Sequence, residues 1–144
     1  MTENLFGFIG LGNMGRPMAQ NIISKNIPLI VHDLAGTKER SPDKAIIAVS
    51  NQDLAKKAKV IALSLPNLES NKSVIREIAD VAKRGTVIVD TCTIGPQAAA
   101  ENKEVLETAG ISYLDSPVSG LKFRAEEGAL VSMVAGDAEA LRSA

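Results

Sequence analysis

The sequence predicts an α/β fold built on a doubly wound parallel sheet. Short runs rich in Val, Ile and Leu recur along the chain, and most are apolar on both faces, as in strands that helices cover on both sides. Amphipathic helical patterns lie between these runs. Strands that alternate with helices are typical of an open parallel sheet, and right-handed crossovers place helices on both of its faces.

Six apolar runs are the expected strands, at residues 5–9, 28–32, 59–64, 86–90, 111–115 and 130–135. Two helical stripes fall between them, one formed by Met14, Met18, Ala19, Ile22 and Ile23 and one by Val74, Ile75, Ile78, Val81 and Ala82. Apolar residues at this spacing share one face of a helix. We therefore expect one domain over residues 1–144.

Boundary signals follow in chain order. Residues 34–44 are polar and carry turn residues, so we expect a loop or a reduced connection after the second strand. Ser50 followed by Asp53 resembles a helix cap, and the basic residues at 56–59 suit the end of that helix. Asp137 is expected to cap a last helix.

Composition narrows the function classes. The 144 residues are 45% hydrophobic with a net charge of −1 and scattered basic residues, so a core is expected but no surface for nucleic acid or an anionic membrane. A single cysteine, Cys92, excludes an internal disulfide, and a single histidine, His32, excludes the usual zinc clusters. No run approaches the roughly 20 apolar residues of a membrane span, and the start lacks signal-peptide features. We expect a cytoplasmic protein without a metal.

A glycine motif marks the first junction of strand and helix. The segment GFIGLGNMGRPM, residues 7–18, spaces Gly10, Gly12 and Gly15 as G-x-G-x-x-G. In a βαβ unit the first glycine permits a tight turn, the second lets the backbone approach a pyrophosphate, and the third lets the helix pack on the strand. The helix is expected to start near Asn13, with its free N–H groups directed at the phosphates.

The second expected strand ends in Asp33, eighteen residues after Gly15. A carboxylate at this point accepts hydrogen bonds from an adenosine ribose. We therefore predict a Rossmann-like domain that binds an adenosine cofactor, and FAD or S-adenosylmethionine stays open beside a dinucleotide. His32 is expected to point away from the ribose and to be structural.

Four ordered motifs carry a family resemblance, namely GFIGLGNMGRPMAQN at 7–21, LPN at 65–67, DTCTIGP at 90–96 and DSPVSG at 115–120. With them the chain resembles the β-hydroxyacid dehydrogenases, which include 3-hydroxyisobutyrate dehydrogenase, tartronate semialdehyde reductase and 6-phosphogluconate dehydrogenase. The resemblance implies an NAD(P)-dependent oxidoreductase. In that family, hydride passes between the β-carbon of a small hydroxyacid and the nicotinamide, and a lysine assists proton transfer.

The resemblance also assigns residues to the cofactor and the substrate. The glycine turn would hold the pyrophosphate through Gly10, Leu11, Gly12, Asn13, Met14 and Gly15. Asp33 would bind the ribose, Leu65 and Pro66 would line the cofactor cleft, and Thr93 would lie near the nicotinamide. Ser119 and Gly120 would face the substrate carboxylate.

The chain departs from the family pattern at Cys92, Leu121 and Arg124, where the family usually has serine, glycine and glycine. The family's catalytic lysine lies in a later G-x-G-x-x-x-K-x-x-N motif, followed by an all-helical domain, and neither is present here. We read Lys122 as a solvated loop lysine and assign no catalytic residue. The chain is expected to be the cofactor-binding part of a longer enzyme, inactive alone, with homo-oligomerisation left open.

Two other functions compete with this interpretation. A non-catalytic dinucleotide-binding module or sensor fits the departures at Leu121 and Arg124. A methyltransferase-like domain explains the glycines and Asp33 but gives the later motifs no role. We expect NAD rather than NADP, because Asp33 would repel a 2′-phosphate and no basic residue precedes Lys38, although Lys38 or Arg40 can fold back over the loop.

Overall fold

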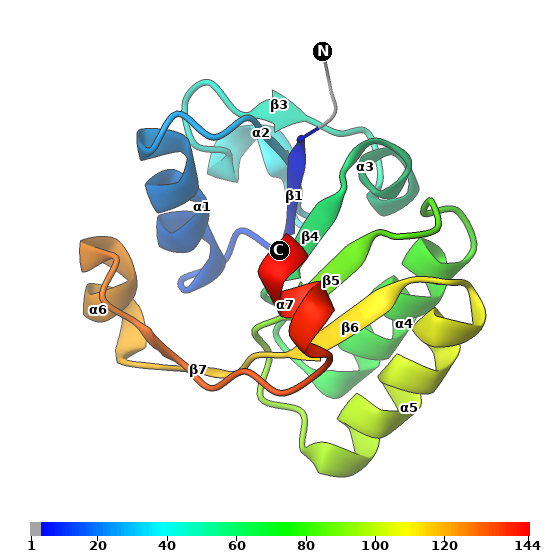
Figure 1. Cartoon of the computed structure of the whole chain (residues 1–144). Helices are drawn as coiled ribbons and strands as arrows, with labels where there is room; N and C mark the ends of the chain where they lie inside the picture. Colours follow the sequence, from blue (N-terminus) through cyan, green and yellow to red (C-terminus); the bar gives the residue numbers. More distant parts are fainter. Residues whose placement is uncertain (1–3) are drawn as a thin grey trace.

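The computed structural model describes residues 4–144, and its centre is a six-stranded parallel sheet of order β3-β2-β1-β4-β5-β6 (Figure 1). The strands are β1 (Phe6–Ile9), β2 (Leu29–His32), β3 (Ile46–Ile47), β4 (Val60–Leu63), β5 (Val87–Asp90) and β6 (Ser112–Asp115). In register, Phe6 of β1 lies between Leu29 of β2 and Val60 of β4. This strand order is that of the Rossmann fold, as predicted.

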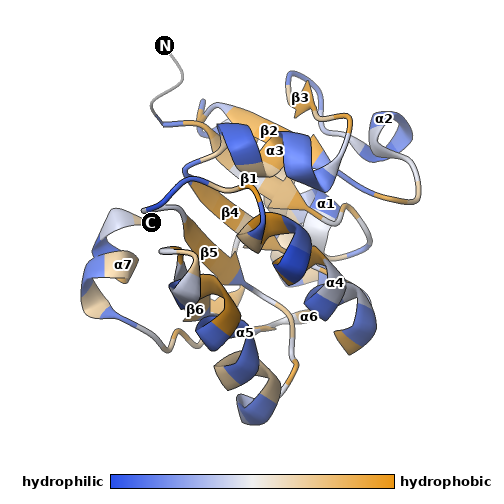
Figure 2. Cartoon of the chain, turned by 90° about the vertical axis from the view of Figure 1, so that its right-hand side faces the viewer, coloured by the Kyte–Doolittle hydropathy of each residue, from blue (hydrophilic) through white to orange (hydrophobic). Residues whose placement is uncertain are grey.

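Helices cover both faces because neighbouring residues of a strand point to opposite sides of the sheet. Phe8 of β1 packs with Ala19 of α1 (Gly15–Ser24), whereas Ile9 belongs to the apolar core beneath three other helices. These are α3 (Asn51–Lys57), α4 (Leu68–Ala79) and α5 (Pro96–Thr108). The strands are apolar and the outer faces of the helices are largely hydrophilic (Figure 2).

Three short helices complete the chain, α2 (Thr37–Arg40), α6 (Leu121–Glu127) and α7 (Ala138–Ser143). Asp137 caps α7 by accepting hydrogen bonds from the backbone N–H groups of Glu139 and Ala140, as expected. No helix within residues 4–144 combines the length and the apolar character that crossing a bilayer requires.

Two expectations about the strands are wrong. In the run at 130–135 only Val131 and Ser132 form a strand, β8, which pairs antiparallel with β7 (Val118–Ser119) outside the main sheet. Val131 is 63% exposed, so apolar composition alone gave a misleading signal of burial. The main sheet is completed instead by β3, a two-residue edge strand where we predicted no element. The expected loop at 34–44 also contains the single turn of α2.

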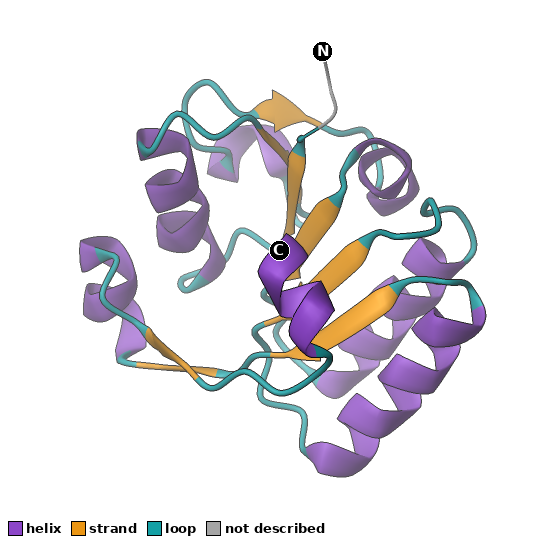
Figure 3. Cartoon of the chain, in the orientation of Figure 1, coloured by secondary structure: helices purple, strands orange, loops and turns teal. Residues whose placement is uncertain are grey.

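The β7–β8 ribbon leads away from the parallel sheet and carries α6 to the side of α1 (Figure 3). Asn21 of α1 donates a hydrogen bond from Nδ2 to the carbonyl oxygen of Ala125, at 2.7 Å. This bond fixes α6 against α1. Lys122, which we expected on a loop, lies within α6, and its Nζ is 3.5 Å from Glu126 Oε1.

Candidate functional site

A cavity of about 1020 Å³ lies where the carboxyl ends of β1, β2 and β4 meet. In an open parallel sheet this edge is where ligands bind. Seven residues predicted from the sequence line the cavity, namely Gly10, Gly12, Asn13, Met14, Asp33, Leu65 and Pro66. The fold thus brings the glycine turn, the carboxylate after β2 and the turn after β4 to one place.

The three glycines of the turn have different environments. Gly10 has a φ of +97°, and a Cβ there would overlap the carbonyl oxygen of Ser64. A Cβ on Gly15 would overlap the carbonyl oxygen of Gly10. A Cβ on Gly12 would meet no heavy atom within 4 Å. Packing inside the protein therefore explains Gly10 and Gly15, whereas Gly12 faces open space.

The backbone around Gly12 presents unused hydrogen-bond donors. Helix α1 begins at Gly15, slightly later than expected, and no side chain caps it. The first helical bond runs from the N–H of Arg16 to the carbonyl of Gly12, at 3.0 Å. Within residues 4–144 the N–H groups of Gly12, Asn13 and Met14 have no acceptor. Free N–H groups at a helix N-terminus favour a bound anion.

Asp33 ties the end of β2 to the glycine turn. Its Oδ2 accepts a hydrogen bond of 2.6 Å from the N–H of Leu11, and its Oδ1 accepts one of 2.8 Å from the N–H of Ala35. The side chain is 10% exposed and borders the cavity. Since each carboxylate oxygen has two lone pairs, Asp33 retains acceptor capacity for a hydroxyl group.

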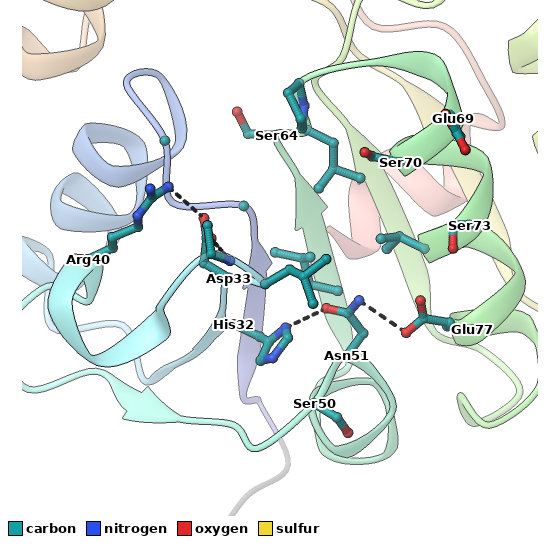
Figure 4. A pocket seen from close by; sticks show the side chains of 18 of the residues that line it. His32, Asp33, Arg40, Ser50, Asn51, Ser64, Glu69, Ser70, Ser73 and Glu77 are labelled. Carbon is teal, nitrogen blue, oxygen red and sulfur yellow. Dashed lines mark hydrogen bonds and ion pairs between the residues drawn. The ribbon is translucent and has the colours of Figure 1, made fainter.

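Arg40 of α2 lies against Asp33, with its Nη1 3.6 Å from Oδ2 (Figure 4). The guanidinium has thus folded back over the 34–44 segment. Arg40 also borders a second cavity of about 500 Å³ on the other side of the glycine turn, which Arg16 and Lys122 line as well. Three basic side chains therefore border this cavity beside Gly12 and Asn13, together with the acidic Glu126, which pairs with Lys122.

A chain of polar side chains that sequence reasoning did not link lines the end of the cavity beyond Asp33. His32 Nδ1 lies 2.7 Å from Asn51 Oδ1, and Asn51 Nδ2 donates a hydrogen bond of 3.1 Å to Glu77 Oε2 (Figure 4). His32 is hydrogen bonded, in agreement with a structural role, but it faces the cavity. Only the fold brings α3 and α4 together here, so no local motif could reveal Asn51 and Glu77.

The remaining predicted residues lie outside the lining of the main cavity. Leu11 is buried behind the turn, and Gly15 packs beneath it. Thr93 is exposed in the loop after β5, Ser119 ends β7, and Gly120 precedes α6 as its N-cap residue. Their assignment to nicotinamide and substrate remains a prediction.

Cys92 does not offer its thiol to a ligand. It is 8% exposed, and Leu65 donates its backbone N–H to the sulfur at 3.2 Å. Burial, together with the negative charge of nearby Asp90, raises the pKa of Cys92 to about 12. The thiol therefore packs into the core beside β4.

Asp90 is the fully buried carboxylate at the end of β5. It accepts hydrogen bonds from Asn71 Nδ2 and the Tyr113 hydroxyl, both at 2.8 Å, and from the N–H of Cys92 at 3.1 Å. Burial raises the pKa of Tyr113, and the charge of Asp90 raises it further. These bonds hold α4, β5 and β6 together at the edge that carries the cavity. Residues 4–144 bring no three metal-ligating side chains into one group.

Residues 5–144 match the family model for the NAD binding domain of 6-phosphogluconate dehydrogenase. The chain belongs to this family. The chain is therefore a nicotinamide dinucleotide-binding domain.

Comparison with individual proteins agrees with this assignment. Mitochondrial 3-hydroxyisobutyrate dehydrogenase of Rattus norvegicus is 38% identical over 135 residues, which are 90% of this chain and 40% of that protein. The structure of Mycobacterium tuberculosis 3-hydroxyisobutyrate dehydrogenase with L-serine is 30% identical with a TM-score of 0.92, covering 97% of this chain and 49% of that one.

A third relative, Psf3 in complex with NADP+ and 2-OPP, is 26% identical with a TM-score of 0.88 and covers 96% of this chain and 51% of its own. The chain thus spans about half the length of these proteins.

Proposed function

We propose that the chain is the cofactor-binding part of an NAD-dependent dehydrogenase that acts on a small β-hydroxyacid. The observation that carries the proposal is the open space at Gly12 beside three free N–H groups, at the edge of a cavity that Asp33 also lines. These residues fit a dinucleotide, since the pyrophosphate needs close backbone approach and the ribose needs an acceptor. When bound, the nicotinamide would accept or supply the hydride.

The substrate class follows from the relatives. The names of two of them mention 3-hydroxyisobutyrate and L-serine, which both carry a carboxylate and a β-hydroxyl group. We assign Ser119 and Gly120 to the substrate side and Thr93 to the nicotinamide side on the strength of the family motifs. No residue of this chain is proposed as the catalytic acid or base.

The choice of NAD rests on Asp33. A 2′-phosphate on the ribose would approach this carboxylate, and two unit charges about 4 Å apart repel by roughly 4 kcal/mol at an effective dielectric near 20. Arg40 partly offsets that repulsion, because its guanidinium already lies beside Asp33. We therefore propose a preference for NAD and keep NADP as the alternative. A cytoplasmic location and a homo-oligomer remain proposals, and one relative is mitochondrial by name.

Calorimetric titration of the chain with NAD, paired with Gly12→Val, tests the proposal. The β-branched side chain would occupy the space of the pyrophosphate without meeting protein atoms near its Cβ. We expect NAD to bind the wild-type chain and not the variant, with an unchanged circular dichroism spectrum. Equal affinity of both proteins for NAD would contradict the proposed site.

A non-catalytic dinucleotide-binding module remains the second candidate. The departures at Leu121 and Arg124 motivate it, yet Leu121 has a φ of +59°, a backbone conformation that favours glycine. The segment therefore keeps the backbone shape that a glycine would adopt there. This favours the dehydrogenase over a module that has lost its substrate loop.

A further inference from the structure

The inference drawn here concerns the end of the main cavity beyond Asp33, and it rests on the proposed binding of a dinucleotide. If the glycine turn holds the pyrophosphate and Asp33 the ribose, the base lies farther along the same cavity. The residues that line this end are Leu34, Val49, Asn51, Val74 and Glu77, together with His32.

Two of these side chains are apolar and almost fully exposed. Leu34 is 94% exposed and Val49 is 86% exposed, and both border the cavity. Neither contributes to the core, so packing within the domain does not account for them. A flat aromatic base placed against these side chains would remove apolar surface from water.

The polar side chains at the same end form one hydrogen-bonded chain whose direction is fixed. Asn51 Nδ2 donates to Glu77 Oε2, so the oxygen Oδ1 of Asn51 faces His32. An amide oxygen only accepts hydrogen bonds, and His32 must therefore donate from Nδ1. In a neutral imidazole with its proton on Nδ1, the other nitrogen, Nε2, is an acceptor.

The chain of bonds leaves two acceptors for a ligand. Within residues 4–144, neither Glu77 Oε1 nor His32 Nε2 has a hydrogen-bond partner. Glu77 and His32 are half-buried, and Asn51 is 8% exposed and holds the two side chains in place. These two acceptors lie at opposite ends of the chain of bonds, with Asn51 between them (Figure 4), so one ligand group cannot reach both. An exocyclic amino group, which donates hydrogen bonds and does not accept them, complements Glu77 Oε1.

We propose that Glu77, held in place by Asn51, selects an adenine base in the dinucleotide by accepting a hydrogen bond from its amino group. A base with an oxygen at the same position, such as hypoxanthine, would place an acceptor against an acceptor. This end of the cavity thus combines apolar contact from Leu34 and Val49 with a hydrogen-bond acceptor that recognises the amino group of the base. Glu77 is the specificity-determining residue, and Asn51 is a positioning residue.

The test compares the affinities of the chain for NAD and for nicotinamide hypoxanthine dinucleotide, which differ in that amino group, by calorimetric titration. We expect wild type to bind NAD about tenfold more tightly, the effect of about one hydrogen bond to a charged acceptor. In Glu77→Gln the side-chain oxygen can still accept from Asn51 while the amide NH₂ faces the ligand. The preference for NAD should then disappear or reverse.

Glu69→Gln is the matched control, because Glu69 lines the same cavity from the same helix α4 but lies outside the hydrogen-bonded chain. This control should keep the tenfold preference. Equal affinities of wild type for the two dinucleotides would overturn base selection alone, as would an unchanged preference in a folded Glu77→Gln. Failure of wild type to bind either dinucleotide would overturn the proposed function and base selection together. If Glu77→Gln does not fold, the wild-type ratio decides.

Discussion

Asp33 and Arg40 place opposite charges near the end of β2, and in the proposed site their balance would set which dinucleotide fits. Asp33 also accepts the N–H of Leu11, so replacing it would loosen the glycine turn as well as change the charge. Arg40 makes no such backbone bond and is the one cation among the described residues that line the main cavity. It is therefore the cleaner position at which to test cofactor preference.

Arg40→Leu should strengthen the preference for NAD. Without the guanidinium, nothing at this end offsets the repulsion between Asp33 and a 2′-phosphate, so we expect NADP affinity to fall about tenfold while NAD affinity changes little. Paired calorimetric titrations with NAD and NADP measure this. Arg76→Leu, an exposed change on α4 outside both cavities, is the control. Equal losses for the two dinucleotides in Arg40→Leu would show that Arg40 does not discriminate between them.

Cys92 should be unreactive in the folded chain. Burial keeps its pKa near 12, against 9.0 for the exposed group, and this lowers the thiolate fraction at pH 8 about a thousandfold. Because the folded pKa is raised, the thiol stays protonated until the pH approaches 12. Reaction with a disulfide reagent at pH 8 should be slow in buffer and fast in urea. Fast labelling in buffer, without loss of the circular dichroism signal, would contradict the buried position.

At the scale of the element, α6 begins with a backbone conformation that its residue type does not predict. The residue Leu121 enters α6 with a φ of +59° and its side chain is 77% exposed. A non-glycine residue in this region carries a strain of about 1–2 kcal/mol, and little burial of Leu121 offsets it.

Leu121→Gly should therefore increase the free energy of unfolding by about 1 kcal/mol, because glycine adopts positive φ without strain. The neighbouring change Lys122→Gly, at a helical position of α6, should decrease it by a similar amount, to which loss of the ion pair with Glu126 adds little. Urea unfolding followed by circular dichroism measures both. A loss of stability in Leu121→Gly as large as that in Lys122→Gly would mean that no strain is stored there.

Elements with continuous apolar runs or a local motif were predictable from the sequence. The strands β1, β2, β4, β5 and β6 bury residues on both faces, and the spacing of its three glycines predicts the glycine turn. The edge strand β3 escaped prediction because it has two residues, Ile46 and Ile47, and both are exposed. The hydrogen-bonded set of His32, Asn51 and Glu77 was not predicted, because its members come from β2, α3 and α4, which meet only in the folded domain.

At the scale of the whole molecule, the strand order brings the candidate site residues together. The two halves of the sheet diverge from β1 and β4, and the turns after these strands reach the same cavity from opposite sides. The face carrying α1 supplies the glycine turn, whereas α3 and α4 on the other face supply the far end of the cavity (Figure 1). A ligand that occupies the whole cavity must therefore contact both layers.

Mapping of backbone amide shifts by NMR on addition of NAD tests this central claim most directly. We predict the largest changes at Gly12, Asn13 and Met14, where free N–H groups would meet the pyrophosphate, and further changes at 33–35 and 65–66. Amides of α5 on the far side of α4 should not move. Shifts confined to residues outside the cavity, or no shifts at millimolar NAD, would contradict the binding of a dinucleotide at the glycine turn.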